Sequence, residues 1–200
     1  EVEDLLVRAG QACGMRTGTG DEIAAGAVIV CTGTFLGGKL YFGMDVIAGG
    51  RTGEGPANAL SATYARLGIA TGRMKTGTCP RIHADTIDYD LFKRAPGDED
   101  PRPFSFSTPR EGFDPNRIDC WLSYSNAETQ RVIHAHLDES PLYAGVIQGI
   151  GPRYCPSIED KVMRFPDKDA HRIFLEPAGL HTPEVYVNGL STSLPEYVPY

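Results

Sequence analysis

The segment AGAVIVCTG, Ala25–Gly33, carries the strongest indication of fold class in this chain. It is a continuous apolar run, which is typical of a strand buried on both faces of a parallel sheet. The run leads into Thr32, Gly33 and Thr34, whose small side chains let the backbone approach a ligand closely. We therefore expect Ala27–Cys31 to lie in the sheet core of an α/β protein, with Gly33 facing a cofactor site.

The segments around this run predict short strands and one helix. VEDLLVRAG (2–10) and ACGMRTGTGDEI (12–23) are typical of strands separated by glycines. PANALSATYARLG (56–68) places its leucines and tyrosine on one helical face, between a proline suited to a first turn and a glycine suited to a stop. Residues 72–115 are rich in proline and predict loops with short strands.

Capping patterns predict two helices in the second half of the chain. Ser125 and Glu128 have capping-box spacing at the start of SNAETQRVIHAHLDES. Ser157 and Asp160 repeat that spacing, so a second helix should begin near Pro156. The strand-like segments are YAGVIQGIG (143–151), HRIFLEP (171–177) and EVYVNGL (184–190).

Composition limits the class of protein. The chain has 200 residues, 41% of them hydrophobic, and a net charge of -7, which argues against a free-standing nucleic-acid binder without excluding a local basic surface. Five cysteines without a Cys-x-x-Cys pair fit a reducing cytoplasm. No apolar run is long enough to cross a bilayer. The chain begins at Glu1 without a methionine or a leader, and we expect it to be an internal piece of a longer protein.

The motif GPRYCPSIEDK, 151–161, places a thiol between two prolines at the expected mouth of a helix. Backbone N–H groups and the helix dipole favour an anion there, and Arg153 adds a positive charge. Both effects lower the pKa of a thiol, which makes Cys155 a candidate nucleophile. The same turn also suits a cofactor phosphate. The alternative is an inert, half-buried cysteine, since free cysteines are commonly structural.

Other candidate ligand-binding segments each fit an ordinary structural role as well. GGRTG (49–53) fits either a phosphate-binding loop around Arg51 or a tight turn. GRMKTGTCPR (72–81), with Lys75, fits either contact with an anionic substrate or a solvated surface. The dinucleotide fingerprint Gly-x-Gly-x-x-Gly is absent from the sequence.

The remaining cysteines and the histidines suggest no metal site. Cys79 and Cys120 are candidates for a second thiol, whereas Cys31 is expected in the core. His134 and His136 cannot share a helix face, and His-Glu-x-x-His does not occur. We therefore assign no metal.

Five segments together resemble the MnmG (GidA) family of flavoproteins. They are VIVCTGTFLGGKLYFG, GGRTGEGP, LGIATGRMKTGTCPRI, SPLYAGVIQGIGPRYCPSIEDKVMRF and IFLEPAGL with EVYVNGLSTSLP, and they occur in the family's order. The resemblance implies part of a glutathione-reductase-like, Rossmann-type FAD-binding domain with an inserted α+β domain. On this basis residues 1–71 belong to the FAD domain, 72–165 to an inserted domain facing NAD and substrate, and 166–200 to strands returning toward the FAD domain.

The resemblance also implies an activity and its cofactors. The family adds an aminomethyl or carboxymethylaminomethyl group at C5 of the tRNA wobble uridine, using FAD, NADH and methylenetetrahydrofolate. It works in the cytoplasm with the GTPase MnmE, as a homodimer and heterotetramer, without a membrane. Two enzyme classes are alternatives: a folate- and FAD-dependent tRNA uridine C5-methyltransferase, and a pyridine-nucleotide flavin oxidoreductase that does not act on RNA. A further alternative is a binding fragment without chemistry, because the chain alone is expected to be inactive.

Site residues follow from the same resemblance, position by position. Cys155 matches the family's functionally important cysteine, and we expect it to be catalytic. Relatives can carry serine where this chain has Ala57, so a side-chain bond to flavin is not expected there. The residues implied in cofactor binding are Val2, Thr32, Gly33, Thr34, Arg51 and Ala57 for FAD, and Gly151, Pro152, Arg153, Tyr154, Cys155, Pro156, Ser157, Ile158, Glu159, Asp160, Lys161, Val162, Met163, Arg164 and Phe165 for NAD.

Overall fold

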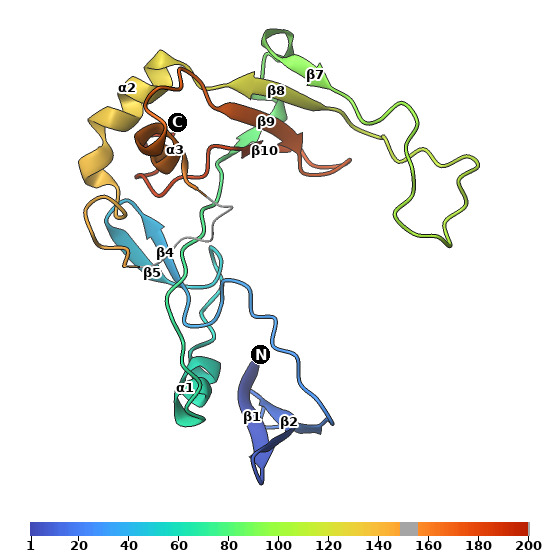
Figure 1. The fold of residues 1–200 in the computed structure, drawn as a ribbon, viewed down its shortest axis with the longest axis vertical. Helices are drawn as coiled ribbons and strands as arrows, with labels where there is room; N and C mark the ends of the chain where they lie inside the picture. Colours follow the sequence, from blue (N-terminus) through green and yellow to red (C-terminus); the bar gives the residue numbers. More distant parts are fainter. Residues whose placement is uncertain (149–155, 200) are drawn as a thin grey trace. The chain divides into compact units, whose positions relative to one another are not determined.

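The computed structural model describes residues 1–148 and 156–199 (Figure 1). The chain divides into two compact units, Glu1–Arg73 and Met74–Tyr200. Within the described residues, no helix has the length and apolar character needed to span a bilayer.

Unit 1 opens with the predicted strands, which form an antiparallel meander. β1 (Val2–Arg8), β2 (Gln11–Thr17) and β3 (Glu22–Ala24) lie in the order β1-β2-β3. Ala9 and Gly10 join β1 to β2, and both have positive φ values, of 50° and 78°. A two-residue connection of this kind matches the twist of the flanking strands. The prediction of strands in this region is confirmed.

A hairpin and a helix complete unit 1. β4 (Lys39–Phe42) pairs with β5 (Asp45–Ala48) in a separate two-stranded sheet. The predicted helix is α1 (Asn58–Arg66), which buries Leu60. Its Thr63 hydroxyl donates a hydrogen bond to the carboxylate of Asp4 on β1, at 2.8 Å, so α1 is fastened to the meander.

The prediction of a buried strand at Ala27–Cys31 is wrong for this structure. The segment is extended, but it belongs to none of the strands of the described residues. Ile29 is 87% exposed, and Cys31 is exposed rather than in the core. A parallel strand buried on both faces needs a neighbour on each edge and helices over each face. The described part of unit 1 supplies no such neighbours.

Unit 2 is built on a five-stranded antiparallel sheet in the order β6-β10-β9-β8-β7. The expected pairing of the last two strand-like segments is confirmed, with Val187 of β10 opposite Leu175 of β9. Figure 1 shows β9 between β8 and β10. The strands are β6 (Arg81–His83), β7 (Lys93–Ala95), β8 (Cys120–Tyr124), β9 (Arg172–Pro177) and β10 (Glu184–Asn188). Single 3-10 turns lie at Ala84–Thr86, Tyr89–Leu91 and Leu137–Glu139.

Two apolar clusters form the core of unit 2. Alternate side chains of the central strands make the first, which is the pattern expected for a sheet with one face on the core: Ile173, Leu175, Val185 and Val187. α2 (Ala127–Ala135) and α3 (Ile158–Arg164) contribute to the second: Ile133, Ile158, Val162 and Leu194.

The capping predictions differ in outcome. Ser157 and Asp160 form the predicted capping box at the start of α3. In α2 the cap is Asn126, one residue later than predicted, and its side chain accepts a hydrogen bond from the N–H of Thr129. Ser125 is instead held beside the sheet, because its backbone N–H donates to the carbonyl of His171 at 2.9 Å.

The predicted strand over residues 143–151 is also wrong, as far as it is described. Residues 141–145 form turns, in which the N–H of Val146 donates to the carbonyl of Pro141. Apolar residues in a short run do not distinguish a strand from a turn that packs on a core.

The contacts of Asp4 predict a pH-dependent contribution to stability. The hydrogen bond from Thr63, followed by the charges of Arg66 and Arg16, lowers the pKa of Asp4. Because the pKa of Asp4 is lower in the folded state, its carboxylate stabilises the fold at pH values above its unfolded pKa of about 4. This stabilisation is lost as the pH falls through the folded pKa. We expect Asp4→Asn to lower the free energy of unfolding by about 1 kcal/mol near neutral pH, and by less below about pH 4. Urea unfolding at both pH values measures this.

Asp45→Asn is the matched control, since Asp45 is an exposed carboxylate of the same unit. An equal loss from both substitutions, or a loss from Asp4→Asn that persists at low pH, would contradict the assignment.

Candidate functional site

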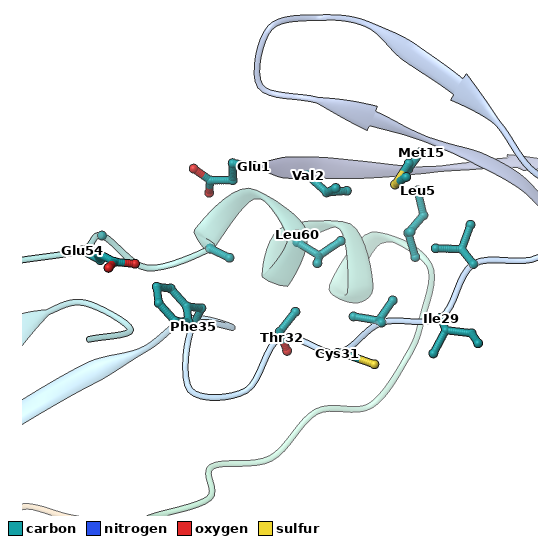
Figure 2. Close-up of a pocket in the computed structure, with 14 residues that line it drawn as sticks. Glu1, Val2, Leu5, Met15, Ile29, Cys31, Thr32, Phe35, Glu54 and Leu60 are labelled. Atoms are coloured by element: carbon teal, nitrogen blue, oxygen red, sulfur yellow. The ribbon is translucent and has the colours of Figure 1, made fainter. Parts of the chain in front are cut away.

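A cavity of about 590 Å³ lies in unit 1. Its volume falls within the range of small-molecule and cofactor pockets, about 300–1,000 Å³. Figure 2 shows Val2 and Leu5 of β1, Leu60 of α1 and the extended segment around Ile29 bordering the same space. The lining residues are Glu1, Val2, Leu5, Met15, Val28, Ile29, Val30, Cys31, Thr32, Phe35, Glu54, Gly55, Ala57 and Leu60.

Three of the residues predicted to meet FAD line this cavity: Val2, Thr32 and Ala57. They come from three segments far apart in the sequence. Gly33, Thr34 and Arg51 are not among the lining residues. The predicted FAD contacts of all six residues stay predictions.

The loops that carry Thr34 and Arg51 are joined to each other. The hydroxyl of Thr34 donates to the carbonyl of Gly50 at 2.6 Å. A Cβ on Gly50 would lie 2.2 Å from the ring of Phe35, so only glycine permits this approach. Arg51 forms an exposed ion pair with Glu54, and an incoming phosphate would have to displace that carboxylate.

The second loop is joined in turn to the start of α1. The N–H of Ala57 donates to the carbonyl of Phe35 at 2.7 Å, and Leu36 and Ala57 form a parallel bridge. Thr32, Phe35 and Ala57 therefore belong to one hydrogen-bonded assembly, which fixes one wall of the cavity.

The cavity is suited to a flat, largely apolar group. Val2, Leu5 and Leu60 provide aliphatic walls, and Met15 adds an adaptable thioether. Glu1 and Glu54 are the charged members of the lining, and no lysine or arginine is among them. The lining therefore fits the ring portion of a dinucleotide cofactor better than its pyrophosphate.

The residues predicted for NAD and for catalysis fall partly outside the described structure. Gly151, Pro152, Arg153, Tyr154 and Cys155 lie outside the described residues, and their assigned roles stay predictions.

The first turn of α3, which follows directly, faces the interior of unit 2. Ser157 and Glu159 are fully buried, and Ile158, Asp160 and Val162 are nearly so. Met163 and Phe165, further along, are 40% and 51% exposed. Pro156 is half-buried and Arg164 exposed. Much of the stretch predicted to meet NAD is thus occupied with internal contacts.

Asp160 is the centre of a buried polar cluster. One carboxylate oxygen accepts from the ammonium of Lys75 at 3.3 Å and from the N–H of Ser157 at 3.3 Å. The other accepts from the hydroxyl of Tyr143 at 3.4 Å and lies 3.8 Å from Arg164. Burial, and then the neighbouring carboxylate, raises the pKa of Tyr143, which keeps it a donor.

Glu159 makes a second internal connection. Its Oε1 accepts from the N–H of Ser193 at 3.0 Å and from the Ser193 hydroxyl at 3.2 Å. The N–H of Ile158 donates to Ser191 at 2.7 Å. The segment after β10 is therefore attached to the first turn of α3.

A second cavity, of about 210 Å³, lies beside α3. Lys161 borders it and donates a hydrogen bond to the carbonyl of Gly189 at 2.9 Å. Its other lining residues are Gly77, Cys79, Pro156, Tyr186, Asn188 and Ser191. This volume lies below the range for cofactor sites, so this cavity by itself is too small to enclose a dinucleotide.

The basic segment 72–81 is not a solvated patch at its centre. Lys75 is buried and paired with Asp160, which corrects the expectation of surface exposure. Arg73 donates to the carbonyl of Gly37 at 2.6 Å, whereas Arg81 lies over the ring of Tyr186.

The two candidate second thiols differ from a typical nucleophile. Burial, and then the charges of Glu176 and Asp119, raises the pKa of Cys120, so its thiolate is scarce at neutral pH. Cys79 is only 4% exposed, and Tyr186 lies beside it. Cys79 lacks the access of a reactive cysteine, and Cys120 lacks electropositive surroundings.

Two features were not predicted from the sequence. The pairing of Lys75 with Asp160 has no local pattern, because the two residues lie far apart in the chain. Phe104 and Phe106 alternate with serines in a loop, and two aromatic residues in a polar segment are a usable signal.

Comparison with known proteins identifies the family. The family model described as "Glucose inhibited division protein A" (GIDA) matches residues 1–199. The chain belongs to the GidA family. The resemblance inferred from sequence motifs is thereby confirmed.

Relatives within the GidA family are close in sequence. The chain is 49% identical over 195 residues to the "tRNA uridine 5-carboxymethylaminomethyl modification enzyme MnmG" of Desulfotalea psychrophila, covering 98% of this chain and 30% of that protein. It is 48% identical over 205 residues to the MnmG of Aquifex aeolicus, covering 100% of this chain and 33% of that protein.

A solved GidA structure has the same fold. "Structure of Aquifex aeolicus GidA in the form I crystal" superposes with a TM-score of 0.87 at 49% identity, covering 99% of this chain and 34% of that one. The fold class is therefore α/β, part of the GidA fold. The chain spans about a third of the length of these relatives.

The buried pair Lys75–Asp160 predicts strong energetic coupling within unit 2. Removing one partner leaves a buried charge uncompensated, so Lys75→Met and Asp160→Asn should each lower the free energy of unfolding by roughly 3–5 kcal/mol. The double substitution should cost clearly less than the sum, because neither charge then remains. Urea unfolding of the four proteins measures the coupling.

The exposed pair Arg94–Asp119 supplies the control. Arg94→Met should cost less than about 1 kcal/mol, as surface pairs do. Strictly additive losses at Lys75 and Asp160 would show that the pair does not interact.

Proposed function

We propose that the full-length protein containing this chain modifies the wobble uridine of tRNA in the cytoplasm. It adds an aminomethyl or carboxymethylaminomethyl group at C5 of the uracil ring. The names of relatives that are 46–49% identical support this activity. The cofactors proposed with it are FAD, NADH and methylenetetrahydrofolate.

One observation carries the proposal. Val2, Thr32 and Ala57, each assigned to FAD from the sequence alone, border one cavity of cofactor size. Residues chosen at random from three segments would not be expected to line the same space. The cavity belongs to a chain that matches the GidA family over nearly its whole length.

In this proposal the residues of unit 1 bind and orient the flavin nucleotide. Val2, Leu5 and Leu60 exclude water from a ring of the cofactor, and the glycine-dependent packing of the two loops keeps the wall rigid. When bound, FAD supplies the electron transfer that converting a folate-derived carbon requires.

Cys155 is proposed as the nucleophile toward the substrate base. Addition of its thiolate to C6 of the uracil ring would make C5 nucleophilic, so that C5 attacks the one-carbon unit. Loss of the C5 proton and departure of the thiolate from C6 would then restore the ring. NADH is proposed as the reductant of the flavin, with residues 151–165 as its binding segment; Met163, Arg164 and Phe165 are the exposed members of that segment among the described residues. The GTPase MnmE is the proposed partner of a homodimer, within a heterotetramer.

Nucleoside analysis of tRNA separates this function from its alternatives. A C5-methyltransferase would yield methyluridine outside the wobble position, and an oxidoreductase that does not act on RNA would leave tRNA unchanged. Loss of the C5 modification in cells that lack the protein, with restoration by the wild-type gene, is the expected result.

Filling the cavity should remove the flavin. Ala57→Phe in the full-length protein places a ring in the space bordered by Val2 and Thr32. We expect the purified variant to lose most of its FAD, which absorbance after denaturation quantifies against protein. Val46→Phe is the control, because Val46 is exposed on β5 of the same unit and does not line the cavity. FAD retained at the wild-type ratio in Ala57→Phe would exclude this cavity as the flavin site.

Cys155→Ser tests the nucleophile. Serine is nearly isosteric but far less nucleophilic at neutral pH, so wobble modification should fall at least tenfold while FAD content is unchanged. Nucleoside analysis of tRNA from cells that depend on the variant measures the loss. Cys120→Ser should retain activity, since the raised pKa of Cys120 makes it a poor nucleophile. Near-normal modification by Cys155→Ser would restrict Cys155 to a role in cofactor binding.

A further inference from the structure

The connection between β7 and β8 is far longer than their pairing requires. Ala95 lies opposite Cys120, so the two strands form a hairpin whose loop is residues 96–119. Hairpin loops are commonly two to five residues, and a long loop without its own strands or helices is usually functional or disordered. Figure 1 shows this loop, in yellow-green, extending away from the sheet of unit 2.

Side-chain contacts close the base of this loop. Asn116 donates to the carbonyl of Asp98 at 2.8 Å, and Arg110 pairs with Asp100 at 2.7 Å. A Cβ on Gly97 would lie 1.9 Å from the Asn116 amide oxygen, so the two arms of the loop approach closely. The loop is therefore an organised projection with a defined tip.

The tip is held by a local turn. The hydroxyl of Ser105 accepts from the N–H of Ser107 at 3.2 Å, and the N–H of Thr108 donates to the Ser105 carbonyl at 3.3 Å. Phe104 and Phe106 flank Ser105, and their relative exposures are 109% and 112%. Both rings are thus fully available to a ligand.

The surroundings of the two rings favour stacking over burial in a protein core. Around Phe104 and Phe106 the tip consists of prolines, serines, a threonine and charged residues. A segment that completes a core presents a contiguous apolar face, whereas stacking needs only the flat face of each ring.

The charge of the loop indicates which part of a nucleic acid it could contact. Its acidic residues outnumber its arginines: Asp98, Glu99, Asp100, Glu111, Asp114 and Asp119 against Arg102, Arg110 and Arg117. The carboxylate of Asp100 also lies near two of those arginines, at 2.7 Å from Arg110 and 4.0 Å from Arg102. An acidic loop repels phosphates, so a nucleic acid would be contacted through its bases rather than its backbone. Unstacked bases in single-stranded RNA loops are the usual targets of aromatic side chains.

We propose that Phe104 and Phe106 stack on unpaired bases of the substrate tRNA, in the anticodon loop beside the modified uridine. This inference rests on the proposed function and assigns part of its RNA-binding surface. The two rings contribute affinity that does not depend on counterion release.

The test uses the full-length protein and a fluorescent anticodon stem-loop RNA, with anisotropy as the readout. Phe104→Ala/Phe106→Ala should weaken binding roughly 10- to 100-fold, the range expected for losing base–aromatic stacking. The slope of log Kd against log salt should not change, because no phosphate contact is lost. Melting temperature and FAD content should stay at wild-type values.

Two further double variants separate stacking from apolar packing. Phe104→Trp/Phe106→Trp keeps flat rings and should bind like wild type, whereas Phe104→Leu/Phe106→Leu keeps apolar volume only and should bind as weakly as the alanine variant. Leu91→Ala is the control, since Leu91 is 76% exposed elsewhere in unit 2, and it should not change binding.

Each contrary outcome has a distinct meaning. Unchanged RNA binding by the alanine variant would overturn the inference and leave the proposed function intact. If the leucine variant binds RNA like wild type, the stacking inference is overturned in favour of apolar packing. The same holds if the alanine variant has a lower melting temperature without RNA, because the two rings then pack against protein. Failure of the wild-type protein to bind the stem-loop would overturn both this inference and the proposed function.

Discussion

The carboxylates of α3 are the constraint on which the arrangement of unit 2 depends. Glu159 and Asp160 both enter the interior, where an unpaired charge would be strongly destabilising. Their partners are Lys75, Tyr143 and Ser193, from segments far apart in the sequence. The hydrogen bonds of Asp160 and of Glu159 Oε1 therefore connect the segment before β6, the turns before α3 and the segment after β10 to this helix, whereas Glu159 Oε2 has no hydrogen-bond partner among the described residues.

Unit 1 is organised by close backbone approach rather than by buried charge. Gly50 allows the ring of Phe35 against the backbone, and hydrogen bonds then join the loops around Thr34 and Ala57. The wall that carries Thr32, Phe35 and Ala57 follows from these contacts, and none of these three residues lies in a strand. Such a wall can be rigid without a sheet, because each of its segments is hydrogen-bonded to the next.

Local patterns in the sequence predicted local structure well. The alternation in β9 and β10 and the capping box at Ser157 depend on residues within a few positions of each other, and both were predicted. The wrong predictions concern segments whose structure depends on residues far away in the sequence. Ala27–Cys31 has no neighbouring strand among the described residues, Ser125 is drawn to the sheet by His171, and Lys75 is buried by Asp160. In the cavity, Val2 and Ala57 were predicted only through the family resemblance, and Thr32 was also predicted from the turn of small residues after the apolar run. Leu60 was not predicted, because its place in the wall follows from packing.

The extended segment Ala27–Cys31 has a consequence for how the chain folds. It is apolar and uncharged, and no strand is paired with it in the described structure. Such an edge is a template for any other extended chain, including a second copy of itself. Until other residues cover such a segment, pairing between chains at high concentration competes with folding. Four of its five residues, Val28, Ile29, Val30 and Cys31, also border the cavity of unit 1, so a group bound there would cover part of the same segment.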